Sequence, residues 1–593
     1  MIFGKHINRY YLRYLHLFIL GIAGLVLVDI YQLVIPELFG NLIDGINKNT
    51  LTEAALLKIV KSLIIIIGIM FLGRFGWRIC IFGLAVQVES DLRRRMFEKV
   101  ELLSVEYFNE HKTGAQMALF TNDLMTIRRC FGSGTMMLVD ALFLGMLTLI
   151  KMIKLQPFLA VVSLIPLILI AIGGVIVGKY MSAKYKKRQE AYEDLSDFTQ
   201  ENFSGLHVIK AFVKESNELR RFRKINKYNE DTNVDFLKFS ISLDVVLGAA
   251  LNFIFLIILG IGSYFVVSTK NTENPFTIGN LSTYVAYFDT LIWPMLAFSQ
   301  LVDMMASGRA SLSRVSELLN EEPKVKDSAD VIKDLDILNS IEGEIEFNNL
   351  SFTYPNSEVE VLSNISFKIN PGEKVGIIGK TGCGKSTIVD LLLRLYNVGD
   401  NELLIDGIDI MKLPIAKMRE LISYVPQDNF LFGTTVKENI AFGVNQYTDE
   451  EVIEAAKLAD VDDNIREFSD QYETIMGERG VTVSGGQKQR ISIARAIMKK
   501  SKIIILDDSV SAVDTKTEKK ILTNLFTRLG DTTLIVIAHR ISTVQELDKI
   551  ILVDDGKIVG CGSHDELLKS SKLYAEMVEL QKLQSKVEED INE

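Results

Sequence analysis

The stretch KVGIIGKTGCGKSTIVDLLL, residues 374–393, joins a strand-like run, a glycine-rich loop and the start of a helix. It satisfies the pattern G-x-x-x-x-G-K-[S/T] in the strand, loop and helix context that this motif requires. Glycines let backbone N–H groups wrap phosphates, and the helix N-terminus adds a positive dipole. The alternative is a plain glycine turn between a strand and a helix. We predict a phosphate-binding loop formed by Gly379, Thr381, Gly382, Cys383, Gly384, Lys385, Ser386 and Thr387.

A second buried strand, IIILDD at residues 503–508, ends in two carboxylates. A hydrophobic run ending in Asp is common on its own, and it gains meaning here because it follows a phosphate-binding loop. In that context Asp507 and the Ser386 hydroxyl are expected to hold Mg²⁺, and Lys385 to reach the outer phosphates. The acidic second half of the chain is therefore predicted to bind and hydrolyse a nucleoside triphosphate.

Further motifs occur around this pair in a fixed order. VSGGQKQRISIARA at 483–496 is similar to the signature motif and following helix of ATP-binding cassette (ABC) proteins. The remaining matches to that family are Tyr354, Gln427 in YVPQD, TIMGERG at 474–480, SAVD ending at Asp514, and His539 in IAHR. The membrane half also matches the exporters of this family, in YFNEHKTG at 107–114, TND at 121–123, ENFSGLHVIKAF at 201–212 and LIWPM at 291–295.

The resemblance assigns roles to these positions. It implies that Tyr354 stacks on adenine, that Gln427 serves the Mg²⁺ site and the Q-loop, that Asp514 belongs to the D-loop, and that His539 is the switch histidine. Taken singly, Tyr354 also fits a strand aromatic, and His539 a satisfied structural histidine. The signature residues would close on ATP held by a second chain, since this chain has one phosphate-binding loop and no internal repeat; they are Ser484, Gly485, Gly486 and Gln487.

One position departs from the family pattern. The general base of the family is a Glu directly after the magnesium Asp, whereas this chain has Asp508. Asp is one methylene shorter, and a misplacement of about 1 Å can cost on the order of 100-fold in rate. The sequence resembles the degenerate-site chain of heterodimeric bacterial multidrug ABC exporters, which implies a non-identical partner with Glu at this position. A still active Asp in a homodimer is the alternative.

The first half has a different composition. Residues 1–325 hold 34 of the 65 Lys and Arg but 29 of the 75 Asp and Glu, and they contain the long apolar runs. Basic residues beside apolar runs are typical of membrane proteins rather than of nucleic-acid binders. Four dispersed cysteines argue against a disulfide framework and a zinc site. Six apolar segments are long enough to span a membrane, at about residues 15–36, 62–86, 131–153, 157–178, 245–269 and 276–307.

The connections between these segments predict the orientation. The short ones hold few lysines, whereas residues 87–130 and 179–244 are long, helical in pattern and rich in Lys and Arg. The positive-inside rule then places these arms, the N-terminus and the second half in the cytoplasm. No signal peptide is expected, and residues 1–14 resemble a helix lying on the membrane surface. The ends of the arms, 109–114 and 205–212, resemble coupling helices of the family.

The predicted fold is an α-helical transmembrane domain with six spans and long cytoplasmic arms, followed by an α/β P-loop NTPase domain of ABC type. The expected boundaries are 1–320 for the membrane domain, 321–340 for a linker and 341–593 for the cassette. The resemblance implies ATP-driven export of amphipathic or hydrophobic small molecules across a bacterial cytoplasmic membrane. Lipid or peptide export by a homodimer, and a non-pumping channel or regulatory subunit, are the alternatives.

The substrate site is the least defined part. Intramembrane polar residues are expected to pair structurally or to contact substrate, and they are Asp29, Gln32, Arg74, Arg78, Asp140 and Asp289. A structural pair between Asp29 and Arg74 or Arg78 is one expectation. Aromatic residues of the last span either pack in the protein or line a cavity, and they are Tyr284, Tyr287, Phe288, Trp293 and Phe298.

Overall fold

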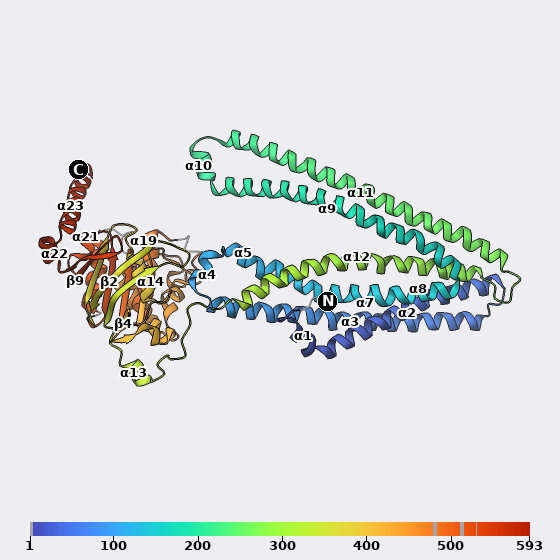
Figure 1. Ribbon diagram of the computed structural model, residues 1–593, viewed down its shortest axis with the longest axis horizontal. Coiled ribbons are helices and arrows are strands. Elements are labelled where there is room, and N and C mark those ends of the chain that lie inside the picture. The colour runs from blue at the N-terminus through green and yellow to red at the C-terminus, as the bar shows by residue number, and fades with distance from the viewer. Residues whose placement is uncertain (1–3, 478–482, 510–514, 529, 593) are drawn as a thin grey trace. The chain divides into compact units, whose positions relative to one another are not determined.

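The computed structural model describes residues 4–477, 483–509, 515–528 and 530–592 (Figure 1). The chain divides into two compact units. The first consists of residues 1–99 and 114–320, and the second of residues 100–113 and 321–593. The helical first unit and the α/β second unit confirm the predicted fold class.

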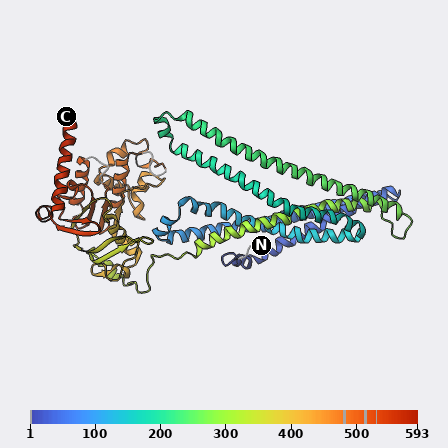
Figure 2. The same ribbon diagram turned by 45° about the horizontal axis from the view of Figure 1, so that its top comes forward.

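The first unit consists of long helices. After the short α1 (Asn8–Arg13), it contains α2 (Leu15–Asn47), α3 (Glu53–Leu102), α9 (Pro157–Ser204), α11 (Glu215–Ser268) and α12 (Ile278–Asn320). Helices α9 and α11 run antiparallel as a long pair that ends in the short α10 (Leu206–Ala211), as both views show (Figures 1 and 2). The arm predicted for residues 179–244 is therefore helical up to its tip.

The third expected span is not one regular helix. The chain from residue 113 to 155 forms α5 (Thr113–Ala118), a π-helical turn η1 (Leu119–Asp123), α6 (Leu124–Phe131), α7 (Ser133–Val139), a second π-helical turn η2 (Asp140–Leu144) and α8 (Gly145–Leu155). An extra residue in a turn redirects the side chains that follow. Apolar composition alone could not predict these two turns.

Five helical segments are long and apolar enough to cross a membrane. They are Leu15–Asn47, Glu53–Leu102, Thr113–Leu155, Glu215–Ser268 and Ile278–Asn320. The fourth expected span begins α9, where the described apolar stretch, Pro157–Ile170, is shorter than a span. The side chains at 171, 174 and 175 lie outside the described ones. The number of six spans therefore stays a prediction.

Helices α2 and α12 approach each other closely at two glycines. A Cβ added at Gly40 would lie 2.6 Å from the Gly279 carbonyl oxygen, and one at Gly279 would lie 2.1 Å from the Gly40 carbonyl oxygen. The backbone N–H of Gly279 donates to Asp44 Oδ1 at 2.8 Å. Only glycine permits this contact, so these positions fix how the first and last long helices of the unit pack.

The cassette is built on two sheets. A mostly parallel sheet has the strand order β10-β9-β3-β8-β7-β6, and an antiparallel sheet has the order β2-β1-β4-β5. The strands are β1 (Ile345–Thr353), β2 (Glu360–Ile369), β3 (Lys374–Gly379), β4 (Leu403–Ile405), β5 (Ile408–Asp409), β6 (Ile422–Val425), β7 (Ile503–Asp507), β8 (Thr533–Ala538), β9 (Lys549–Asp554) and β10 (Lys557–Gly562). Near-continuous apolar runs form β3, β7 and β8, as expected for parallel strands covered on both faces.

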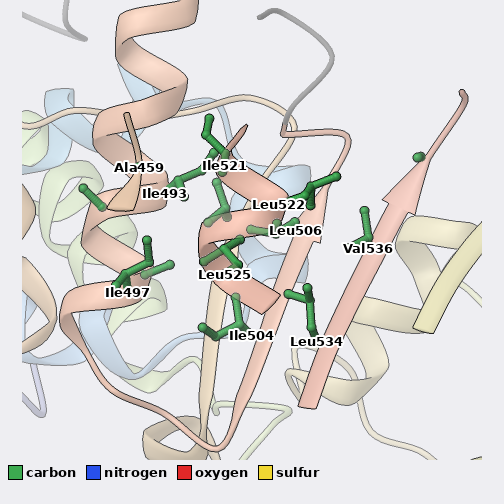
Figure 3. Close-up of a cluster of buried hydrophobic side chains, with 14 of the residues drawn as sticks. Ala459, Ile493, Ile497, Ile504, Leu506, Ile521, Leu522, Leu525, Leu534 and Val536 are labelled. Carbon is green, nitrogen blue, oxygen red and sulfur yellow. The ribbon is translucent and has the colours of Figure 1, made fainter. Parts of the chain in front are cut away.

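Helices cover both faces of the larger sheet. The helices of the second unit after residue 320 are α13 (Leu335–Asn339), α14 (Lys385–Leu392), α15 (Ile415–Leu421), α16 (Val436–Ile440), α17 (Asp449–Leu458), α18 (Asp462–Arg466), α19 (Gly485–Met498), α20 (Thr515–Arg528), α21 (Ile541–Val544), α22 (His564–Ser570) and α23 (Lys572–Asn592). Alternate residues of β7 face opposite cores. Ile504 and Leu506 pack with Ile493 of α19 and Leu525 of α20 (Figure 3), whereas Ile505 packs in the core on the other face.

Candidate nucleotide site

The glycine-rich loop runs from the end of β3 to the start of α14. Gly382 and Gly384 have φ angles of +82° and +99°, which side chains other than glycine rarely adopt. A Cβ at Gly384 would also lie 2.7 Å from the Leu362 side chain, and one at Gly379 would lie 2.1 Å from the Val553 carbonyl oxygen. The glycine spacing recognised in the sequence therefore follows from the space that this loop leaves.

Lys385 lies at the start of α14 with its side chain buried. Its Nζ donates to the carbonyl oxygens of Gly379 and Lys380, both at 2.9 Å. These bonds hold the ammonium group inside the loop, where it can meet the phosphate oxygens. Cys383 is 6% exposed and packs in the core beneath the loop, and burial raises the pKa of its thiol. Its side chain is therefore a small buried group beneath the loop.

Two carboxylates follow β7. Asp507 is 3% exposed and accepts hydrogen bonds from the hydroxyl groups of Ser386 and Tyr424, the latter at 3.3 Å. Burial raises the pKa of Asp507, against the lowering effect of these two bonds. Asp508 adopts a φ of +45°, and its backbone N–H donates to the Ile537 carbonyl oxygen at 2.9 Å. Gln427 Nε2 donates to Asp508 Oδ2 at 3.4 Å.

These groups surround one cavity of about 350 Å³. Its lining contains most of the predicted nucleotide-site residues together with two that were not predicted, Val361 and Ile537. The predicted members are Tyr354, Thr381, Gly382, Gly384, Lys385, Ser386, Thr387, Gln427, Asp507, Asp508 and His539. Gly379 and Cys383 shape the loop without lining the cavity. The set of side chains and backbone groups fits a nucleoside triphosphate with Mg²⁺. The backbone N–H groups and the ammonium suit the phosphates, whereas the hydroxyl and the buried carboxylate suit the metal ion.

Tyr354 lines this cavity and is also part of a second set of contacts. Its hydroxyl is 3.0 Å from Thr387 Oγ1 and 3.2 Å from Asp390 Oδ2, and burial raises its pKa to about 12. Its ring packs edge-to-face on Tyr396 at 5.2 Å. Tyr396 accepts a hydrogen bond from Asn109 of α4 (Val105–Glu110) at 3.2 Å. Sequence reasoning missed Tyr396, because no motif marks it.

His539 follows β8, and the C-terminal helix holds the backbone around it. Gln581 of α23 donates from Nε2 to the His539 carbonyl oxygen and accepts at Oε1 from the Ile541 N–H, both at 2.7 Å. One amide side chain thus fixes two backbone groups next to His539. No local signal in the sequence indicates this contact, since 42 residues separate Gln581 from His539.

The signature residues do not line this cavity. Ser484 is the N-cap of α19, and its side chain and that of Gln487 form a reciprocal capping box. Ser484 and Gly485 are exposed, so the N-terminus of α19 is accessible. Gln489 of the same helix donates to the Asp508 carbonyl oxygen at 3.3 Å. Asp514 and residues 478–480 of the TIMGERG motif lie outside the described residues.

The polar groups of the membrane unit have separate environments. Asp140 in η2 accepts a hydrogen bond from Trp293 Nε1 at 2.8 Å, although Trp293 is 41% exposed. Asp29 is buried and interacts electrostatically with Arg74, but no described ion pair joins it to Arg74 or Arg78.

Of the aromatic residues in the last span, Tyr284, Tyr287 and Phe288 are fully buried. The Tyr284 hydroxyl lies 2.8 Å from Ser163 Oγ, and Tyr287 donates to the Leu33 carbonyl oxygen and to Glu37. These three residues therefore pack inside the protein. Phe298, by contrast, is 58% exposed.

The chain matches known proteins over nearly its whole length. The family model of the ABC transporter transmembrane region matches residues 18–295, and the ABC transporter model matches residues 362–511. "Probable multidrug resistance ABC transporter ATP-binding/permease protein YheI" of Bacillus subtilis is 36% identical over 98% of this chain and 97% of that protein. "Multidrug resistance-like ATP-binding protein MdlA" of Escherichia coli is 34% identical over the same shares.

A solved structure has the same fold. The structure of a bacterial Atm1-family ABC exporter with ATP bound covers 97% of this chain and 98% of its own, with a TM-score of 0.74 and 24% sequence identity. ABC half-transporters of this architecture work as dimers. A membrane unit of long helices, a cassette with a phosphate-binding loop, and relatives alike over the full length lead to one conclusion: the chain belongs to the ABC transporter family, as an ATP-driven half-transporter of the exporter type.

Proposed function

We propose that this chain is one half of an exporter that moves amphipathic or hydrophobic small molecules out of a bacterial cell. The observation that carries the proposal is the single cavity in which the phosphate-binding loop, Asp507, Gln427 and His539 converge. The names of two relatives, YheI and MdlA, add the multidrug-resistance substrate class. The cassettes and the N-terminus would lie in the cytoplasm, in agreement with the positively charged arms.

We infer that the residues of the cavity bind different parts of ATP and serve different steps of its hydrolysis. Tyr354 would stack on the adenine, and the loop N–H groups with Lys385 would bind the phosphates. Asp507 and Ser386 would hold Mg²⁺, which neutralises phosphate charge when bound, with Gln427 completing the site. His539 and Asp508 would orient the attacking water. The signature residues Ser484 to Gln487 would close on ATP of the partner, and Asp514 would adjoin that interface.

The contacts of α4 support a route from the nucleotide to the spans. Within the second unit, Asn109 bonds to Tyr396, Glu110 accepts from Asn356 at 2.5 Å, and Glu106 pairs with Lys324 at 2.6 Å. Since Tyr396 contacts Tyr354, closure of the cassettes around ATP would pull on α4. The tip of the second arm, residues 179–244, has exposed apolar side chains, which suit docking to a partner cassette. Phe212 is 70% exposed and Val213 is 81% exposed.

We further propose a heterodimer in which this chain contributes the slower hydrolytic site. Asp508 is one methylene shorter than the usual Glu, and its backbone is fixed by the bond to Ile537. The partner would supply Glu at the corresponding position. Homodimeric lipid or peptide export remains the second candidate, and Asp508 also favours a channel or regulatory subunit with little hydrolysis.

Transport into inside-out vesicles tests the proposal. Vesicles containing this chain and its partner should accumulate radiolabelled amphipathic compounds with ATP but not with a non-hydrolysable analogue, and Lys385→Ala in this chain should lower uptake. A channel would equilibrate the compounds under both conditions. Robust ATP turnover by this chain purified alone, abolished by Asp508→Asn, would contradict the heterodimer.

A further inference from the structure

One face of α3 combines two arginines with exposed apolar side chains in the middle of an apolar span. Ile67, Phe71, Arg74 and Arg78 follow one another at spacings of four, three and four residues, so they share one side of the helix. Phe71 is 68% exposed and Ile67 60%, and both arginines are exposed. With Ile35, Met70 and Phe75 these residues line a cavity of about 470 Å³, within the range of about 300–1,000 Å³ typical of ligand sites.

Packing on the opposite face of α3 keeps these residues facing outward. Ile66, Trp77 and Ile81 of α3 are buried in a cluster with Leu25 and Val28 of α2. Rotating α3 to bury the arginines would expose that cluster. The guanidinium of Arg78 lies 5.5 Å from the Trp77 ring centroid. This contact restrains the Arg78 side chain without neutralising its charge.

The two cations form no ion pair within the described part of this chain, and the carboxylate that interacts electrostatically with Arg74 is that of the buried Asp29. None of the ion pairs there involves Arg74 or Arg78, whereas Glu37 pairs with Lys151 and Glu89 with Arg128. Arginine facing lipid hydrocarbon is costly, and intramembrane arginines usually face a water-filled cavity or an anionic partner. One buried carboxylate cannot neutralise two guanidinium groups, so a further anion is expected from outside the described chain.

We propose that this cavity, bounded by Ile35, Ile67, Met70, Phe71, Arg74, Phe75 and Arg78, binds the anionic headgroup and the adjoining hydrocarbon of an amphipathic substrate. Two guanidinium groups one turn apart match a sulfate, phosphate or carboxylate, which they can bind with several charge-assisted hydrogen bonds. Phe71, Phe75 and Ile67 match the hydrocarbon. The inference rests on the proposed export function and narrows its substrate class to anionic amphiphiles.

Equilibrium binding of three probes with one hydrocarbon chain tests the charge selection. The full-length chain with its partner, in nanodiscs without ATP, is titrated with oleyl sulfate, oleyl alcohol and oleyltrimethylammonium, with empty nanodiscs as the blank. We expect oleyl sulfate to bind most tightly. Arg74→Gln or Arg78→Gln should weaken its binding about tenfold each, as for loss of a hydrogen bond to a charged group, and should leave oleyl alcohol unchanged.

Two matched variants separate charge from packing. Arg74→Lys should retain most of the sulfate preference, whereas Phe71→Ala should weaken all three probes alike. Equal wild-type affinity for the sulfate and the ammonium probe overturns the inference, and this comparison needs no variant to fold. If the arginine variants change how the two chains assemble but not which probe binds most tightly, the inference is also overturned, because the partner chain would then cover this face of α3. ATP-driven uptake of oleyl alcohol with no sulfate preference would overturn this site while leaving the export function intact.

Discussion

At the scale of single residues, Asp508 is the position where a small change should have the largest effect on catalysis. Its backbone is fixed by the N–H bond to Ile537, and Gln427 contacts its carboxylate. Asp508→Glu therefore extends the carboxylate into the cavity without moving the strand. We expect ATP turnover at this site to rise, on the order of 100-fold if the missing methylene misplaces the base by about 1 Å.

Steady-state ATPase assays on the assembled transporter measure this change. Asp508→Asn is the control, since it preserves size but removes the base. If Asp508→Glu leaves turnover at the wild-type level, the shorter side chain is not what limits this site.

Glu518 in α20 gives a pH-dependent prediction. It is 4% exposed, accepts a hydrogen bond from Thr543 and lies 3.9 Å from Arg540 Nη1. Burial raises its pKa above the ordinary value, against the opposing effects of Thr543 and Arg540. A raised pKa means that its stabilising contribution is complete below the unfolded-state pKa and is lost as pH rises through the folded-state pKa.

Glu518→Gln keeps the size and the acceptor for Thr543 but carries no charge. The variant should therefore gain thermal stability relative to the wild type as pH rises from about 4 to about 8, and the two should converge at the acid end. Melting of the full-length chain in detergent across this range measures the difference. A pH-independent difference would show that burial of the Glu518 charge is not its cause.

At the scale of elements, the contact between α23 and the loop after β8 positions a predicted functional group. Gln581 bonds to the carbonyl of His539 and the N–H of Ile541. Gln581→Ala should lower kcat for ATP several-fold with little change in KM, because the histidine shifts while the phosphate-binding loop stays intact. Leu580→Ala on the same helix is the matched control, since Leu580 is 61% exposed. A rise in KM with unchanged kcat would contradict a role for Gln581 through His539.

The elements also show what sequence could and could not predict. The phosphate-binding loop, the strand ending in Asp507 and the positions of Gln427 and His539 were predictable, because a motif of a few residues defines each local geometry. The contacts of Tyr396 and Gln581 were not, since each depends on segments brought together only by tertiary folding. The π-helical turns in residues 113–155 were missed because apolar composition does not encode helix register.

At the scale of the whole molecule, the number of spans decides which parts face the cytoplasm. Six spans place residues 50 and 271 outside and residue 214 with the cassette inside; without a span in residues 157–178, residue 214 would lie outside. Single cysteines at Thr50→Cys and Asn271→Cys should react with a membrane-impermeant maleimide in intact cells. Lys214→Cys and the native, exposed Cys561 should react only after permeabilisation. Labelling of Lys214→Cys in intact cells would falsify the six-span topology.

The hydrogen bond between Trp293 and Asp140 has a practical consequence for kinetics. The chain contains two tryptophans, and the other, Trp77, is buried beside α2. Trp293 belongs to α12 and its partner to the π-helical turn η2, so any sliding of α12 past η2 breaks this bond and changes the solvation of a half-exposed indole. In a Trp77→Phe background the intrinsic fluorescence of Trp293 therefore reports the conformational steps of the transport cycle. Stopped-flow mixing with ATP measures their rates without an attached dye.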